Sequence, residues 1–147
     1  MAISPLVERF LDLAKQYFRK EIDDSPELAC EGGERVAFAD DLLKDVCRRP
    51  QEYYKYLNSI STYGYAGLSS GGRNGIVRVR KTDSNLLERI NRFLESAKGQ
   101  KVLQRHGITA EDVEPVKVVA HVMSGKRLIG IRRDGLTVLI DKVGYKK

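Results

Sequence analysis

The spacing of apolar residues along the chain predicts four helices. Leucine, alanine and aromatic residues recur every three or four positions from residue 5 to about 21, and the same period returns over 34–47. A proline at position 50 can open a short helix over 51–58. The longest helix begins at Asp83 or Ser84 and carries a stripe of leucine, isoleucine and phenylalanine. We expect these stripes to face a common core.

Local signals at helix ends support two of these predictions. Ser4 and Pro5 suit a helix start, because a hydroxyl can cap the first turn and proline is favoured at the first helical position. The longest helix has a weak point at Gly99, where it either ends or continues to His106. Gly107 is then the expected residue after its end.

Alternation of apolar and polar residues predicts two groups of strands. Residues 60–66 and 76–81 form a β-hairpin around a glycine-rich tip, with Arg78 and Arg80 on one face and valines on the other. A three-stranded antiparallel meander follows near the C-terminus, with an Asp-Gly turn before its last strand, and its strands are expected over 116–123, 127–132 and 136–143. The fold class is α+β: N-terminal helices, a β-hairpin, a long helix and a C-terminal meander in one mixed domain over 1–147.

The composition is that of a globular protein outside the membrane. A chain of 147 residues with 41% apolar and 31% charged residues matches one ordinary domain. No apolar run is long enough to span a membrane, and the N-terminus lacks the pattern of a secretory signal. We therefore expect a cytoplasmic protein without a membrane partner.

Few residues could carry catalysis or bind a metal. Cys30 and Cys47 form no C-x-x-C motif, and His106 and His121 do not complete a zinc spacing with them. The cysteines are expected to be free thiols, and a disulfide between them is the alternative that spacing alone does not exclude. No nucleophile–base pattern emerges, so we expect no enzyme, no metal and no cofactor.

Charge is distributed unevenly along the chain. Residues 1–45 hold six Lys/Arg against eleven Asp/Glu, whereas residues 46–147 hold twenty against nine, which together give the net charge of +6. An acidic helical lead followed by a basic remainder is typical of a protein with an anionic partner, nucleic acid above all.

Tyrosine and arginine are interleaved in one segment, 53–81. Its glycine loop matches neither G-x-G-x-x-G nor a Walker motif and precedes a strand, so it does not predict a nucleotide site. Proteins that bind single strands combine a basic groove with rings on which bases stack. We expect such a surface to bind single-stranded DNA or RNA with little sequence preference, through Arg48, Arg49, Tyr53, Tyr54, Tyr63, Tyr65, Arg73, Arg78, Arg80, Lys81, Lys117, Lys126, Arg127 and Arg132.

Other functions remain open at this stage. Helices over 34–47 and 51–58 followed by a hairpin have the order of a winged helix that reads duplex DNA, although the second helix offers few base-reading side chains. Alternatively, the chain is an assembly subunit of a larger nucleoprotein complex, or a homo-oligomer. The sequence does not distinguish DNA from RNA.

The chain resembles the ThermoDBP group, archaeal single-stranded DNA-binding proteins without an OB-fold. The resemblance lies in chain length, the order of helices and strands, the high charge, and tyrosines interleaved with Arg78, Arg80 and the 67–75 loop. It implies a cleft between helices and sheet that binds single strands. A second likeness, to the small subunit of archaeal type I-A CRISPR effectors, implies assembly beside a guide–target duplex.

Overall fold

The computed structural model of the chain describes residues 5–19, 27–29, 34–53, 56–57, 75–119 and 126–144. One mixed sheet has the strand order β1-β2-β6-β5-β4-β3. Its strands are β1 (Leu28–Ala29), β2 (Arg35–Phe38), β3 (Gly75–Arg78), β4 (Glu114–Val119), β5 (Lys126–Arg133) and β6 (Leu136–Gly144). The helices are α1 (Pro5–Arg19), α2 (Asp40–Arg48), α4 (Ser84–Glu95) and α5 (Ala97–Arg105). The predicted α+β class and the C-terminal meander are confirmed, and β3 joins the meander through β4.

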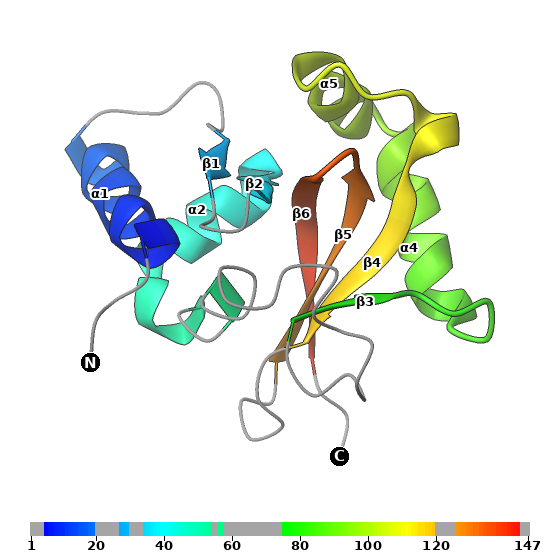
Figure 1. The fold of residues 1–147 in the computed structure, drawn as a ribbon, viewed down its shortest axis with the longest axis horizontal. Helices are drawn as coiled ribbons and strands as arrows, with labels where there is room; N and C mark the ends of the chain where they lie inside the picture. Colours follow the sequence, from blue (N-terminus) through cyan, green and yellow to red (C-terminus); the bar gives the residue numbers. More distant parts are fainter. Residues whose placement is uncertain are drawn as a thin grey trace.

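Helices cover the two faces of this sheet (Figure 1). α1 and α2 lie on one side of the strands, and α4 and α5 lie on the other. Two apolar clusters result. Phe10 of α1 and Leu128 of β5 belong to the first cluster, and Ile90 of α4 and Ile129 of β5 belong to the second. Adjacent strand residues point to opposite faces, so β5 contributes to both clusters.

The segment predicted as a helix over 34–47 is instead a strand followed by a shorter helix. β2 pairs in parallel with β6 and antiparallel with β1. Val36 and Phe38 face the α1–α2 cluster, and Ala37 faces the α4–α5 cluster. A short apolar run fits a buried strand as well as a helix, and helices on both faces of the sheet favour the strand here.

The long helix breaks at Ser96, three residues before Gly99. Ser96 is extended, with φ −75° and ψ 161°. Its Oγ donates to the Phe93 carbonyl at 2.6 Å and accepts from the Gly99 N–H at 3.0 Å. Gly99 is needed because a Cβ there would lie 1.7 Å from the Phe93 carbonyl oxygen. One serine thus ends α4 and caps α5.

The end of α5 follows the prediction. Gly107 has φ +64° and donates its N–H to Gln104 O at 3.2 Å. Ile108 N–H reaches Leu103 O at 2.8 Å. These two bonds form a Schellman motif, in which glycine takes the left-handed position without strain.

The hairpin between β5 and β6 contains the predicted Asp-Gly turn and an additional bulge. Asp134 and Gly135 have φ +49° and +78°, values that suit a tight turn matching the twist of the strands. The register shifts so that Ile129 faces Asp141 while Gly130 faces Leu139. The extra residue on β6 brings Asp141 to the α4 side of the sheet.

Among the helices that the structure describes, none has both the length and the apolarity needed to cross a bilayer.

Candidate functional site

Cationic residues follow one another at the outer edge of the sheet. β3 pairs with β4, and the described residues place no strand on its other side. Val79 extends this ladder by donating its N–H to Pro115 O at 3.0 Å, and its side chain is buried in the α4–α5 cluster. The alternation of an extended chain therefore turns Arg78 and Arg80 away from that cluster.

Among the described residues, carboxylates compensate the charge at this edge only in part. The Arg78 side chain is 72% exposed and pairs with Glu114 on β4. Arg80 and Lys81 are exposed, and neither side chain forms an ion pair with the residues that the structure describes. We call Arg78, Arg80 and Lys81 the β3 cations. They are three of the predicted binding residues, and the structure brings them together.

Three further predicted residues are not among the β3 cations. Arg48 and Arg49 are exposed at the C-terminal end of α2, and Arg49 lies 3.9 Å from Glu52. Figure 1 shows α2 and the β3–α4 connection on opposite sides of the molecule. Lys117 is half-buried on β4. The two arginines of α2 are thus separate from the β3 cations.

Arg132, predicted to bind nucleic acid, belongs to a part-buried polar cluster. Its Nε donates to Glu34 Oε1 at 3.0 Å and its Nη2 to Oε2 at 3.4 Å. The fully buried hydroxyl of Thr137 donates to the same Glu34 Oε1 at 2.9 Å. Arg132 and Glu34 side chains are only 22% and 10% exposed. Arg78 also pairs with a carboxylate but is 72% exposed, so the far less exposed guanidinium of Arg132 has mainly a structural role here.

The ring of Tyr53, another predicted contact, is buried rather than displayed. Tyr53 is 1% exposed and Tyr56 is fully buried in the α1–α2 cluster, with ring centroids 6.3 Å apart. Base stacking requires an accessible ring face, so the structure gives Tyr53 a packing role. The remaining predicted residues Tyr54, Tyr63, Tyr65 and Arg73, and the side chains of Lys126 and Arg127, lie outside the described part of the chain.

Tyr53 also takes part in a polar contact among α2, the following helical turn and β6. Its hydroxyl donates to Asp45 Oδ2, and Lys142 Nζ donates to the same oxygen at 2.8 Å. These bonds, from Lys142 first and then Tyr53, lower the pKa of Asp45. Burial, followed by the nearby Asp45 carboxylate, raises the pKa of Tyr53. Asp45 is therefore an ionised acceptor at neutral pH.

Substituting Asp45 with asparagine should change the acid stability of the protein. Because the folded pKa of Asp45 lies below its ordinary value of 3.8, its stabilising contribution is complete above that value and is lost as pH falls through the folded pKa. At neutral pH the Asp45→Asn variant should lose about 1–2 kcal/mol of unfolding free energy. Urea denaturation at neutral pH and between about pH 4 and pH 2 measures both effects.

Asp12→Asn, at an exposed position of α1, is the matched control and should change stability by less than about 0.5 kcal/mol. If wild type and Asp45→Asn lost stability in parallel on acidification, Asp45 would not contribute as described.

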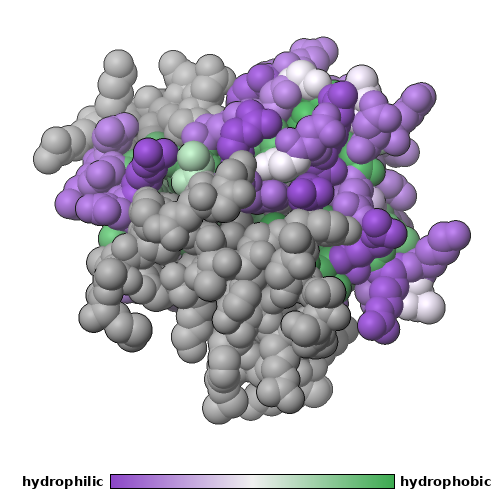
Figure 2. Space-filling view, viewed as in Figure 1, coloured by the Kyte–Doolittle hydropathy of each residue, from purple (hydrophilic) through white to green (hydrophobic). Residues whose placement is uncertain are grey.

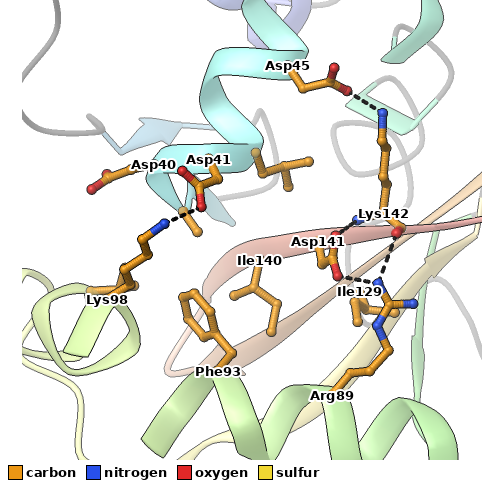
Figure 3. Close-up of a pocket in the computed structure, with 13 residues that line it drawn as sticks. Asp40, Asp41, Asp45, Arg89, Phe93, Lys98, Ile129, Ile140, Asp141 and Lys142 are labelled. Carbon is orange, nitrogen blue, oxygen red and sulfur yellow. Dashed lines mark hydrogen bonds and ion pairs between the residues drawn. The ribbon is translucent and has the colours of Figure 1, made fainter. Parts of the chain in front are cut away.

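A pocket between the two helical layers was not predicted from the sequence. It has a volume of about 290 Å³ and is lined by residues of α2, α4, α5, β5 and β6. Figure 3 shows Phe93 and Ile140 between two ion pairs, Lys98–Asp41 and Arg89–Asp141. The sequence carries no signal for this site because Arg89 and Asp141 are 52 residues apart.

Within the described residues, no group of three or more histidine, cysteine, aspartate or glutamate side chains could hold a metal ion. Cys47 is a buried free thiol, as predicted, and burial raises its pKa to about 11. Such a thiol stays protonated and is a poor nucleophile at neutral pH. Cys30 lies outside the described residues.

Comparisons with protein-family models, with curated proteins and with solved structures find no match to this chain.

Proposed function

We propose that the chain binds single-stranded nucleic acid, DNA or RNA, through the β3 cations, with little preference for sequence. The observation that carries this proposal is the charge of Arg80 and Lys81, which no carboxylate among the described residues pairs, beside the exposed Arg78. Two other cations, Arg132 and Lys142, are instead bound by carboxylates. Charge left without a carboxylate is available to phosphate groups.

The geometry of β3 suits an extended phosphate chain. Side chains on one face of a strand repeat about every 6.6 Å, so Arg78 and Arg80 present guanidinium groups at regular intervals. Guanidinium groups bind phosphate with two parallel hydrogen bonds. The surface over the β3–α4 connection is hydrophilic in Figure 2, at the right of the view. These features support backbone binding and provide no means of reading bases.

Stacking makes a smaller contribution than the sequence suggested. Tyr53 and Tyr56 are buried, so any stacked rings in this proposal are those of Tyr54, Tyr63 or Tyr65. The contacts on the described surface are electrostatic, and their strength depends on salt. The salt dependence of the affinity is therefore the most direct measurement of these contacts.

We expect binding to a fluorescent oligothymidylate to weaken steeply with salt. Three phosphates neutralised at about −0.7 each give a slope near −2 in log affinity against log salt. Between about 50 and 200 mM salt this corresponds to a loss of about 20-fold. Fluorescence anisotropy with single-stranded DNA, single-stranded RNA and duplex DNA measures the slope and the preference. A flat salt response would contradict the proposal, and tighter binding to duplex would favour a duplex reader.

A further inference from the structure

The pocket between the helical layers has an apolar floor and a rim of paired charges. Phe93, Val102 and Ile140 contribute apolar side chains, and two ion pairs flank them. Figure 3 shows Arg89 and Asp141 on one side of the opening and Lys98 and Asp41 on the other. Neither pair contains a β3 cation, so the pocket is a site separate from the proposed nucleic-acid surface.

The two ion pairs differ in how strongly water screens them. Lys98 and Asp41 side chains are 70% and 68% exposed, whereas those of Arg89 and Asp141 are 40% and 45% exposed. Less solvent around a charge strengthens its interaction with a ligand. Arg89 also offers a planar fork that matches a carboxylate. The Arg89–Asp141 pair is therefore the better candidate to bind the charged groups of a ligand.

We propose that this pocket binds a free α-amino acid with an apolar side chain. Its α-carboxylate accepts hydrogen bonds from Arg89, its α-ammonium donates to Asp141, and its side chain packs on Phe93 and Ile140. A zwitterion carries both charges a few ångströms apart, so it can satisfy both members of the pair at once. Arg89 and Asp141 bind each other in the structure. A zwitterion that separates them gives each a new partner, whereas a ligand with only one charge that separates them leaves the other without one, which is unfavourable in a half-buried site.

The size of the pocket restricts the ligand further. Its volume is about 290 Å³. That space suits leucine or phenylalanine. It is at the lower limit of ligand pockets, which start at about 300 Å³, and is too small for a nucleotide cofactor.

The test uses L-leucine and L-phenylalanine with the intact wild-type chain in isothermal titration calorimetry. We expect saturable binding with a Kd below about 1 mM for at least one of them. N-acetyl-L-leucine, which lacks the ammonium, and L-leucinamide, which lacks the carboxylate, should each bind at least about tenfold more weakly. No saturable binding of either amino acid, or binding of either analogue as tightly as L-leucine, would overturn the proposal.

Two substitutions in the protein test the proposed contacts with Arg89 and Asp141. Arg89→Met should weaken binding of the carboxylate, and Asp141→Asn should weaken binding of the ammonium, each by at least about tenfold. Arg92→Met is the matched control, because Arg92 lies on the same helix in an exposed pair with Glu88. Thermal unfolding of each variant establishes that it is folded. Wild-type affinity in a folded Arg89→Met or Asp141→Asn variant would contradict binding of the ligand at this ion pair.

Discussion

Replacing Gly130 with alanine should cost the protein about 3 kcal/mol of unfolding free energy or more. A Cβ at this position would lie 2.3 Å from the Val138 carbonyl oxygen and 3.1 Å from Leu139 Cα. Both are backbone atoms of β6, and β5 is held between β4 and β6. Because neither neighbouring strand can withdraw without breaking its own ladder, the contact cannot relax cheaply. The glycine at this bulge is therefore required by the close approach of two backbones.

Gly107→Ala is the matched control for this substitution. A Cβ at Gly107 meets no atom within 4 Å, so the change carries only the cost of a left-handed backbone, about 1–2 kcal/mol. Urea denaturation of the two variants gives the difference directly. Equal losses at the two positions would show that the β5–β6 bulge can accommodate a side chain.

Substituting Glu34 with alanine is expected to cost about 3–5 kcal/mol. Glu34 accepts two hydrogen bonds from Arg132 and one from the buried Thr137 hydroxyl. Removing it takes away a carboxylate partner of a largely buried guanidinium and an acceptor of a hydroxyl that water does not reach. Loss of one member of a buried pair is far more costly than loss of both.

A double substitution separates this explanation from a general packing defect. Glu34→Ala with Arg132→Met should be more stable than the sum of the two single losses predicts, because no guanidinium is left to satisfy. Glu88→Ala, in an exposed pair with Arg92, should lose less than about 1 kcal/mol. Urea denaturation of the four variants provides the comparison. Strict additivity at Glu34 and Arg132 would contradict the coupling described.

Local signals in the sequence were enough for the parts of the fold that depend on local geometry. Gly107 and the Asp134–Gly135 turn require positive φ, and glycine or aspartate at those positions indicates this directly. The C-terminal strands alternate clearly and were predicted within a few residues. Serine at position 96 overrode the expectation at Gly99, because a side-chain cap can break a helix that the apolar stripe would continue.

The first half of the segment 34–47 could not be assigned from its own residues. Val36 to Phe38 are buried on both faces only because β6, about one hundred positions later, lies beside them. An apolar run acquires its strand character from that partner. The winged-helix order relied on a single helix over this segment, so it loses one of its supports.

The candidate binding surface, like the fold, could be predicted from the sequence only in part. The exposure of Arg78 and Arg80 follows from strand alternation, which the sequence displays. The burial of Tyr53 and the pairing of Arg132 depend on Asp45 and Glu34, and Glu34 lies 98 residues from Arg132. Composition identifies the cations of a chain; the partners that neutralise some of them are set by the tertiary structure.

The central proposal, that the β3 cations neutralise phosphate groups, is tested most directly by removing two of them. The Arg80→Ala, Lys81→Ala double variant is compared with an Arg9→Ala, Lys15→Ala variant, which loses the same charge from exposed positions of α1. Salt titrations with single-stranded oligothymidylate should give the first variant a slope less steep than wild type by about 1.4 and leave the slope of the second unchanged. Equal slopes for the two variants, or a wild-type slope in the first, would contradict the account.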